Sequence, residues 1–272
     1  MESKKYNFRV IKSGEITEIY AYENCRIKTV YTEDEQINKQ ELKNKYLMQS
    51  KTGEVDRKLF SGQEEIDIDG EIYKRLLVNV YRTRRDLKRL INANIGQHPF
   101  KEKFLTLTFD RDVTREDALD EFKKFNKRMR YYYGDYEYIG VIELTEKNRI
   151  HFHIILFGLD FIRKKEVYET WRNGWIRINA VDDYYDLANY IVKYIEKTLT
   201  EDNFIDKHKK FYFNSKKLFK PVEVLYEDTE AEQLQELLEE TSYMISEYEY
   251  ESDHVGYVKY YKFKKVKARG DN

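Results

Sequence analysis

Hydrophobic and polar positions alternate with different periods along the chain, and the changes of period divide it into three parts. Residues 1–75 alternate mainly with the period of two that is typical of half-buried strands. Residues 76–221 switch between strand-like runs and helix-like stripes, whereas residues 222–272 begin as an acidic amphipathic stripe and end as a basic strand-like segment. We therefore expect a β-rich N-terminal extension of unknown role, a core domain, and a C-terminal acidic helix and basic strand that pack on the core.

The N-terminal part predicts two strands joined by a tight turn. The segments YNFRVIKSG and EITEIYAYEN alternate between polar and apolar residues, and Ser13 and Gly14 lie between them at the predicted turn. Residues 34–50 are polar and periodic, which indicates a helix. No residue of this part carries chemistry that suggests a function.

The central part predicts the order β-α-β-β-α-β-α. Thr114 is expected to cap the first helix, because Asp117 follows three residues later as in a capping box. The second helix is expected to stop at Gly174 in a left-handed conformation. This order is that of a split β-α-β, ferredoxin-like α+β fold with one extra helix and an antiparallel sheet covered on one face. The expected strands are 103–110, 136–144, 150–158 and 175–181, and the expected helices are 114–131, 163–174 and 182–199.

The C-terminal part combines strong acidity with an amphipathic stripe. Residues 227–253 contain eleven acids and no Lys or Arg, and Leu234, Leu237, Leu238 and Ile245 recur at helix-like intervals. We interpret this stretch as a surface helix that packs on the core or competes with nucleic acid for basic surfaces. The final residues are expected to form a strand and a basic tail.

The composition narrows the classes of function. The chain has 272 residues, of which 36% are charged, yet its net charge is only −1, so a nucleic-acid site would have to arise from local asymmetry of charge. Cys25 is the one cysteine, which excludes an internal disulfide and suits a reducing cytoplasm. No apolar segment suggests a signal peptide or a membrane span.

Two of the five histidines, His151 and His153, lie one residue apart on the predicted strand IHFHIILFG. Residues two apart on a strand point to the same face, so the two imidazoles can converge on one metal ion. Random placement of five histidines would produce such a pair only about 0.1 times in a chain of this length. A pair of structural histidines on a half-buried face is the alternative interpretation.

The neighbouring strand supplies a third ligand for such an ion. If the hairpin around the turn TEKNR is symmetric about Lys147, Glu143 lies directly opposite His151 and shares its face. The predicted ligand set is therefore His151, His153 and Glu143. Mixed nitrogen and oxygen ligands suit Mn²⁺ or Mg²⁺ acting as a Lewis acid, while Zn²⁺ and Fe²⁺ stay possible. A shifted register would bring Glu146 into play instead.

The last predicted helix of the core carries candidate nucleophiles. In YIVKYIEK, the offsets of three, four and seven place Tyr190, Lys193, Tyr194 and Lys197 on one helical stripe. A phenol is a poor nucleophile at its ordinary pKa of about 10, but a metal ion and lysines neutralise the phosphate that it attacks. Tyrosines of an amphipathic helix also commonly pack, and with 25 tyrosines such a pair arises readily by chance.

A basic segment precedes the core strands. Residues 81–103 contain seven Lys or Arg and two acids, and Leu87, Leu90 and Ile91 occur there at helical spacing. This pattern fits a solvated helix face, and it also fits a clamp on DNA phosphates. The candidate DNA contacts are Arg82, Arg84, Arg85, Lys88 and Arg89, and further bases follow in FNSKKLFKP at residues 213–221.

Taken in order, these motifs resemble those of the HUH endonuclease superfamily, in particular the rolling-circle replication initiators, or Rep proteins, of small phages and plasmids. FLTLTFD is similar to the first motif, HFH followed by IILFG to the His-hydrophobic-His motif, and YIVKYIEK to the two-tyrosine motif. TWRNGWIRIN is also similar to bacterial and phage members, and the resemblance covers residues 80–221. Each motif is weak alone, whereas the ordered set is specific.

The resemblance implies a site-specific endonuclease and strand transferase that nicks single-stranded origin DNA, with or without a hairpin, through a 5′-phosphotyrosine intermediate. It implies that His151, His153 and Glu143 hold the metal, that Tyr190 and Tyr194 are nucleophiles, and that lysines 193 and 197 contact phosphate or orient the metal-bound groups. Because the sequence contains no G-x-x-x-x-G-K-[ST] loop, a host helicase would unwind the origin. A host polymerase would extend the free 3′ end in the bacterial cytoplasm.

Three alternatives remain at this level. A relaxase or single-strand transposase of the same superfamily shares the chemistry, although relaxases more often carry the tyrosine upstream of the histidines. A non-catalytic origin-binding regulator would keep the fold but has no need of the ligands and tyrosines. An iron oxygenase with two histidines and one carboxylate would show a His-x-Asp/Glu spacing that is missing here.

Overall fold

The computed structural model describes residues 2–30, 68–144, 149–180, 187–194, 212–227, 238, 242–252 and 255–266. The chain divides into two compact units. The first comprises Met1–Val10, Glu18–Tyr73 and Glu223–Asn272, and the second comprises Ile11–Thr17 and Lys74–Val222. The boundaries expected from the sequence, 1–75, 76–221 and 222–272, stay a prediction. No helix of the described residues is long and apolar enough to cross a bilayer.

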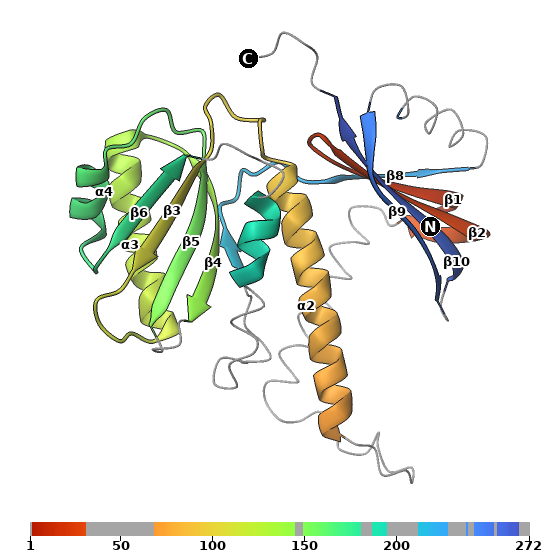
Figure 1. Ribbon diagram of the computed structural model, residues 1–272, viewed down its shortest axis with the longest axis horizontal. Helices are drawn as coiled ribbons and strands as arrows, with labels where there is room; N and C mark the ends of the chain where they lie inside the picture. Colours follow the sequence, from red (N-terminus) through yellow and green to blue (C-terminus); the bar gives the residue numbers. More distant parts are fainter. Residues whose placement is uncertain are drawn as a thin grey trace. The chain divides into compact units, whose positions relative to one another are not determined.

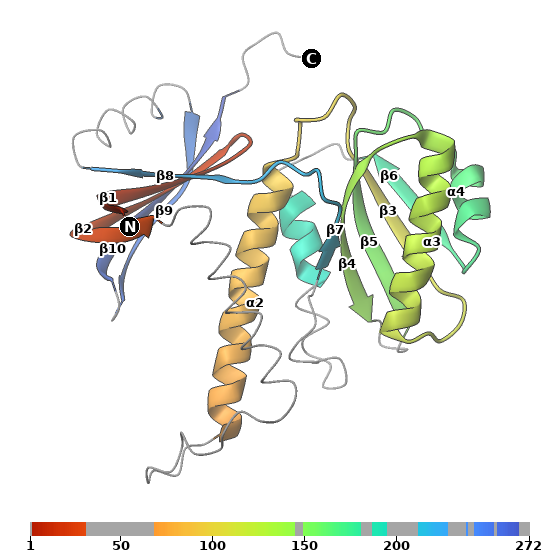
Figure 2. The ribbon, with the colours of Figure 1, turned by 180° about the vertical axis from the view of Figure 1, so that it is seen from behind.

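The first unit contains a five-stranded sheet in the order β8-β1-β2-β10-β9 (Figures 1 and 2). Its strands are β1 (Glu2–Ser13), β2 (Ile16–Val30), β8 (Val222–Tyr226), β9 (Ser242–Ser252) and β10 (Gly256–Lys265). Strands from both ends of the sequence thus join one sheet. The turn at Ser13 and Gly14 is confirmed, and the φ of Gly14 is 59°, a left-handed value that glycine adopts without steric cost. The helix expected at 34–50 lies outside the described residues.

The acidic C-terminal segment corrects one prediction, because Ser242–Ser252 is a strand and not a helix. This strand pairs antiparallel with β10, so that Glu249 lies opposite Lys259 and their side chains form a 3.1 Å ion pair. The sequence SYMISEYEYE alternates with a period of two, which is the pattern of a strand. The basic final strand expected from the sequence is confirmed as β10.

The second unit contains an antiparallel sheet in the order β6-β3-β5-β4-β7. Four of its strands lie where the sequence places them, namely β3 (Lys103–Thr108), β4 (Glu137–Leu144), β5 (Ile150–Phe157) and β6 (Ile176–Ala180). The edge strand β7 (Tyr212–Asn214) was not predicted. The central β5 is hydrogen-bonded on both sides, to β3 and to β4, and therefore forms the middle of the sheet.

Helices cover both faces of this sheet, whereas the sequence analysis expected one covered face. On one face α3 (Arg115–Tyr133) and α4 (Lys164–Trp171) pack on Leu105, Phe152 and other residues of one core cluster. On the other face α2 (Ile68–Asn92) and a helix at residues 187–194 pack on Phe104, Ile155 and their neighbours. Figures 1 and 2 show these pairs on opposite sides of the sheet. Continuous apolar runs such as IILF provide two buried faces.

The ends of α3 and α4 test the predicted capping. The Thr114 side chain accepts a 3.1 Å hydrogen bond from the backbone N–H of Asp117, which confirms the N-cap. Helix α4 ends earlier than expected, because Arg172 and not Gly174 adopts the left-handed conformation, with a φ of 62°. Gly174 serves a different purpose, since a Cβ there would approach the Thr108 carbonyl oxygen to 2.4 Å. Because glycine has no Cβ, the chain that enters β6 can pack closely against β3 at this position.

Candidate metal and nucleophile site

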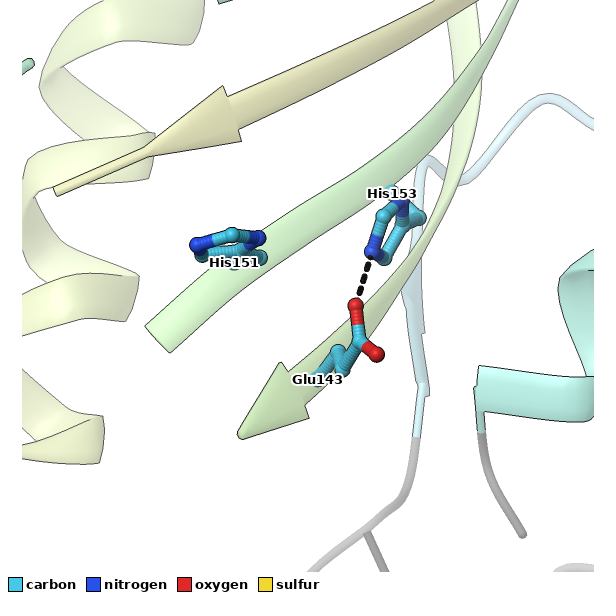
Figure 3. Close-up of side chains that lie close together, drawn as sticks. All are labelled: Glu143, His151 and His153. Carbon is cyan, nitrogen blue, oxygen red and sulfur yellow. Dashed lines mark hydrogen bonds and ion pairs between the residues drawn. The ribbon is translucent and has the colours of Figure 1, made fainter. Parts of the chain in front are cut away.

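The β4–β5 hairpin brings together the three predicted metal ligands. Glu143 of β4 pairs with His151 of β5, which confirms the register expected from a hairpin symmetric about residue 147. His153 lies two residues further along β5 and therefore points to the same face. Figure 3 shows all three side chains on this face of the two strands. The period of two along each strand thus suffices to create the cluster.

The three side chains are close enough to act together. Their nitrogen and oxygen ligand atoms all lie within 4.8 Å of one another. His153 Nε2 lies 2.6 Å from Glu143 Oε2, the contact drawn as a dashed line in Figure 3. Both side chains are buried, with exposed fractions of 5% and 6%, whereas His151 is half-buried. A buried carboxylate needs such a partner, because its desolvation would otherwise be costly.

The geometry of the cluster fits a divalent metal ion. Two atoms bound to one ion at about 2.1 Å lie at most about 4.2 Å apart, so small rotations of these side chains would bring all three atoms to one ion. Burial lowers the pKa of His151 below its usual value, although the charge of Glu143 opposes this effect. The imidazole is therefore neutral at neutral pH, which is the form that binds metals.

The helix at residues 187–194 places both predicted tyrosines beside the cluster. The ring of Tyr194 stacks on His153 with 3.5 Å between centroids and 10° between planes. The Tyr190 ring lies 5.2 Å from that of Tyr194 at 89°, and the Tyr194 hydroxyl donates a hydrogen bond to the Tyr190 oxygen. Phe104 contacts Tyr190 edge-on from β3, with 5.5 Å between ring centroids. The two tyrosines are thus adjacent, and Tyr194 is the one in contact with a predicted metal ligand, His153.

The surroundings of Tyr194 keep its hydroxyl protonated. Burial is the largest cause that raises its pKa, and the hydrogen bond with Tyr190 and the negative charge of Glu143 raise it further. Arg177 acts in the opposite direction. A cation beside Glu143 would cancel part of the negative potential, so it would make the phenol a better nucleophile.

The basic residues predicted to contact DNA differ in their exposure to solvent. Lys193 is exposed on the tyrosine helix, and Lys197 lies outside the described residues. On α2, Arg82 and Arg85 are exposed, while Arg89 is 7% exposed and lies 3.9 Å from Asp86. Arg84 and Lys88 are half-buried on the same helix. The exposed arginines are therefore the stronger candidates for DNA contacts on α2.

Sequence reasoning missed two residues on the same face of the sheet. The register aligns Arg177 of β6 with Thr106 of β3, and Thr106 in turn with His153. The Thr106 hydroxyl lies 3.5 Å from His153 Nδ1, and Arg177 is exposed. The signal was present in WIRIN, where a charged residue sits between two isoleucines that pack on the opposite face. An arginine in this row adds positive charge beside the cluster.

Residues 102–199 match the family model of the replication-associated protein ORF2. Among solved structures, the hypothetical protein ORF119 from Sulfolobus islandicus rod-shaped virus 1 matches with 21% identity and a TM-score of 0.33. The match covers 43% of this chain and 96% of that protein.

No curated protein matches the chain at a significant level. The family match spans all three clustered side chains and both tyrosines. It confirms the resemblance to rolling-circle Rep proteins that the ordered motifs indicated. Residues 102–199 of this chain are therefore similar to the replication-associated protein ORF2 family, and this match covers about a third of the chain.

Proposed function

We propose that this protein is a metal-dependent, site-specific endonuclease and strand transferase for single-stranded DNA that initiates rolling-circle replication. The observation that carries the proposal is the stacking of Tyr194 on His153, because it joins a candidate nucleophile to a candidate ligand cluster. The family match and the antiparallel order β6-β3-β5-β4 support a ferredoxin-like HUH core within residues 76–221.

Glu143, His151 and His153 would hold Mn²⁺ or Mg²⁺, whose positive charge would polarise the scissile phosphate. The buried carboxylate and the two imidazoles provide a mixed oxygen and nitrogen ligand set suited to these ions. Burial of β5 on both faces fixes the spacing of the two imidazoles. The three side chains would therefore hold the ion with little reorganisation during the reaction.

Tyr194 is the first nucleophile in this proposal. Its oxygen forms a bond to phosphorus, and the bond between phosphorus and the 3′ oxygen breaks. The phenol proton leaves along the hydrogen bond to Tyr190 and through solvent, and the 3′ oxygen departs as a hydroxyl. The resulting phosphotyrosine diester conserves the energy of the broken bond, so a later attack by a 3′ hydroxyl can rejoin the strand.

Tyr190 would perform the second transfer. It lies one helical turn from Tyr194 and is more exposed, with 45% of its surface accessible. Lys193, Lys197 and Arg177 would contact phosphates near the reacting bond, and Arg82 and Arg85 would contact the strand further away. A host helicase and a host polymerase in the bacterial cytoplasm would complete the replication cycle.

A denaturing gel tests the proposal most directly. The protein is incubated with labelled single-stranded DNA that contains the cognate origin, in the presence of Mn²⁺. We expect a labelled band that migrates with the protein after denaturation, since a phosphotyrosine bond survives denaturation. The adduct should disappear in EDTA and in the His151→Ala variant, and His98→Ala provides a matched histidine control outside the ligand cluster.

Tyrosine variants divide the roles within the site. Tyr194→Phe should abolish the first adduct, whereas Tyr190→Phe should permit cleavage and impair the second transfer. Tyr168→Phe removes a hydroxyl from an exposed tyrosine on α4 and should change neither step. If DNA binds but no variant or metal produces an adduct, the chain is a binding regulator and not a nuclease. An adduct on transfer-origin or transposon-end DNA, with none on a replication origin, would instead identify a relaxase or a transposase.

A further inference from the structure

A groove of about 610 Å³ lies between α3 and α4, and this volume is within the range of ligand sites. We call it the α3–α4 groove. It lies on the face of the sheet opposite to the metal cluster, because α3 and α4 pack on the Phe152 side while His151 and His153 point to the other side. The groove is lined by Lys127, Arg128, Tyr131, Tyr132, Glu166, Glu169, Thr170 and Arg172.

Two arginines of the groove are held in place by the backbone. Arg128 donates from Nε to the Thr170 carbonyl oxygen at 2.9 Å, and Arg172 donates from Nε to the Glu169 carbonyl oxygen at 2.9 Å. Within the described parts of the chain, the terminal nitrogens of these two guanidinium groups have no other hydrogen-bond partner. The two guanidinium groups are thus oriented before a ligand binds, and their terminal N–H groups remain available to bind phosphate in a bidentate manner.

The arginine at the end of α4 has an uncommon backbone conformation. Among the non-glycine residues that the structure describes, Arg172 alone has a positive φ, at 62°. An arginine in the left-handed region costs free energy that a glycine would not, and Arg172 is one of the residues that line the groove. Lys127 is exposed on α3 and adds a third positive charge to the same lining.

Two tyrosines of the groove are exposed far beyond what packing requires. The exposed fractions of Tyr131 and Tyr132 are 85% and 64%, and their rings meet edge to face with 5.4 Å between centroids at 83°. Each ring therefore offers a free face to a flat ligand. Because the two faces are nearly perpendicular, they suit two bases that are not stacked on each other, which is the state of a single strand and not of a duplex.

The carboxylates of the lining do not cancel its positive charge. Glu166 lies 3.1 Å from Arg163, and its other oxygen accepts a hydrogen bond from the Tyr133 hydroxyl. Glu169 lies 3.9 Å from Lys165 of the same helix. Each acid thus has a cation of its own, while three cationic side chains face the groove. The groove therefore favours an anionic ligand.

We propose that the α3–α4 groove binds single-stranded DNA, with bases stacked on Tyr131 and Tyr132 and phosphates held by Lys127, Arg128 and Arg172. The alternation of free aromatic faces and oriented cations is the combination by which proteins bind single strands without sequence preference. The choice of DNA over other single-stranded nucleic acid rests on the proposed function. The groove would hold a part of the strand remote from the reacting phosphate.

Fluorescence anisotropy of the full-length protein with a labelled oligothymidylate tests this site separately from catalysis. EDTA and a His151→Ala background exclude any contribution from the metal cluster. The paired substitution Tyr131→Ala with Tyr132→Ala should weaken binding about tenfold or more, because each base–aromatic stack contributes strongly. Lys127→Ala should weaken binding. In a plot of the logarithm of the affinity against the logarithm of the salt concentration, the slope should become shallower by about 0.7.

Tyr168→Ala is the matched control, because Tyr168 is an exposed tyrosine of α4 outside the groove. It should leave the affinity unchanged. An unchanged affinity for oligothymidylate in the paired tyrosine variant would overturn the proposal. If this variant lost affinity for an oligouridylate and kept its affinity for oligothymidylate, the groove would bind RNA, and the proposal would also be overturned. A change of oligomeric state with no change in DNA affinity would assign the groove to a second copy of the chain and overturn it as well. The adduct gel reports on the metal site independently of every one of these results.

Discussion

Replacing Glu143 with glutamine tests whether this buried carboxylate serves the fold or the binding of a metal ion. The side chain is 6% exposed, and its Oε2 lies 2.6 Å from His153 Nε2. Glutamine preserves the shape and can still form a hydrogen bond with the imidazole, but it removes a buried negative charge. We therefore expect the unfolding free energy of the metal-free variant to lie within about 1 kcal/mol of that of the parent protein.

The expected effect on metal binding is much larger. An ion present at 100 times its dissociation constant stabilises the folded protein by about 2.7 kcal/mol. Loss of one of three protein ligands should weaken binding by at least about 100-fold, which leaves about 0.4 kcal/mol of stabilisation at the same concentration. For a chain of this size, the increase in melting temperature should fall from about 5–10 °C to about 1 °C.

Thermal unfolding with and without Mn²⁺ measures both quantities in one experiment. The parent protein, Glu143→Gln and a control variant, Glu102→Gln, are compared at the same metal concentration. Glu102 is a carboxylate of similar burial, 2% exposed, outside the cluster, so its variant should retain the full metal-dependent shift. An equal Mn²⁺ shift in Glu143→Gln and in the parent would show that Glu143 is not a ligand and refute the reasoning.

Three further predictions concern acidity, packing and charge. Because burial lowers the pKa of His151 below its usual 6.5, protons should displace Mn²⁺ only below pH 6.5. A loss of the Mn²⁺-dependent rise in melting temperature that is centred above pH 6.5 would contradict this prediction. Phe152→Ala, which empties the centre of the core beneath α3, should reduce the urea-unfolding free energy by about 3–5 kcal/mol. Arg177→Ala should slow DNA cleavage without changing the Mn²⁺ shift, and an equal loss of both would assign Arg177 a structural role.

The ligand cluster could be predicted because it depends on local geometry alone. A short hairpin with a symmetric turn sets the register, and the period of two in each strand then decides which side chains share a face. The prediction that Glu143 lies opposite His151 needed no knowledge of the rest of the fold. The tyrosines followed in the same way from the period of a helix, since Tyr190 and Tyr194 are one turn apart.

Features that depend on distant parts of the chain could not be predicted. The acids and the apolar stripe of residues 227–253 suggested one helix, whereas Ser242–Ser252 is a strand that pairs with β10 and forms the ion pair of Glu249 with Lys259. Helices on both faces of the second sheet required Leu87 and Ile91 of α2 to pack against strands far along the sequence. Arg177 was overlooked because its importance lies in alignment with Thr106 and His153 across three strands.

The central place of β5 in its sheet has a consequence for how the site behaves over time. The strand is hydrogen-bonded to β3 on one side and to β4 on the other, and nearly all its residues are buried. Amide protons of such a strand exchange with solvent only when the whole sheet opens. We therefore expect the imidazoles of His151 and His153 to keep their spacing when other parts of the molecule open locally.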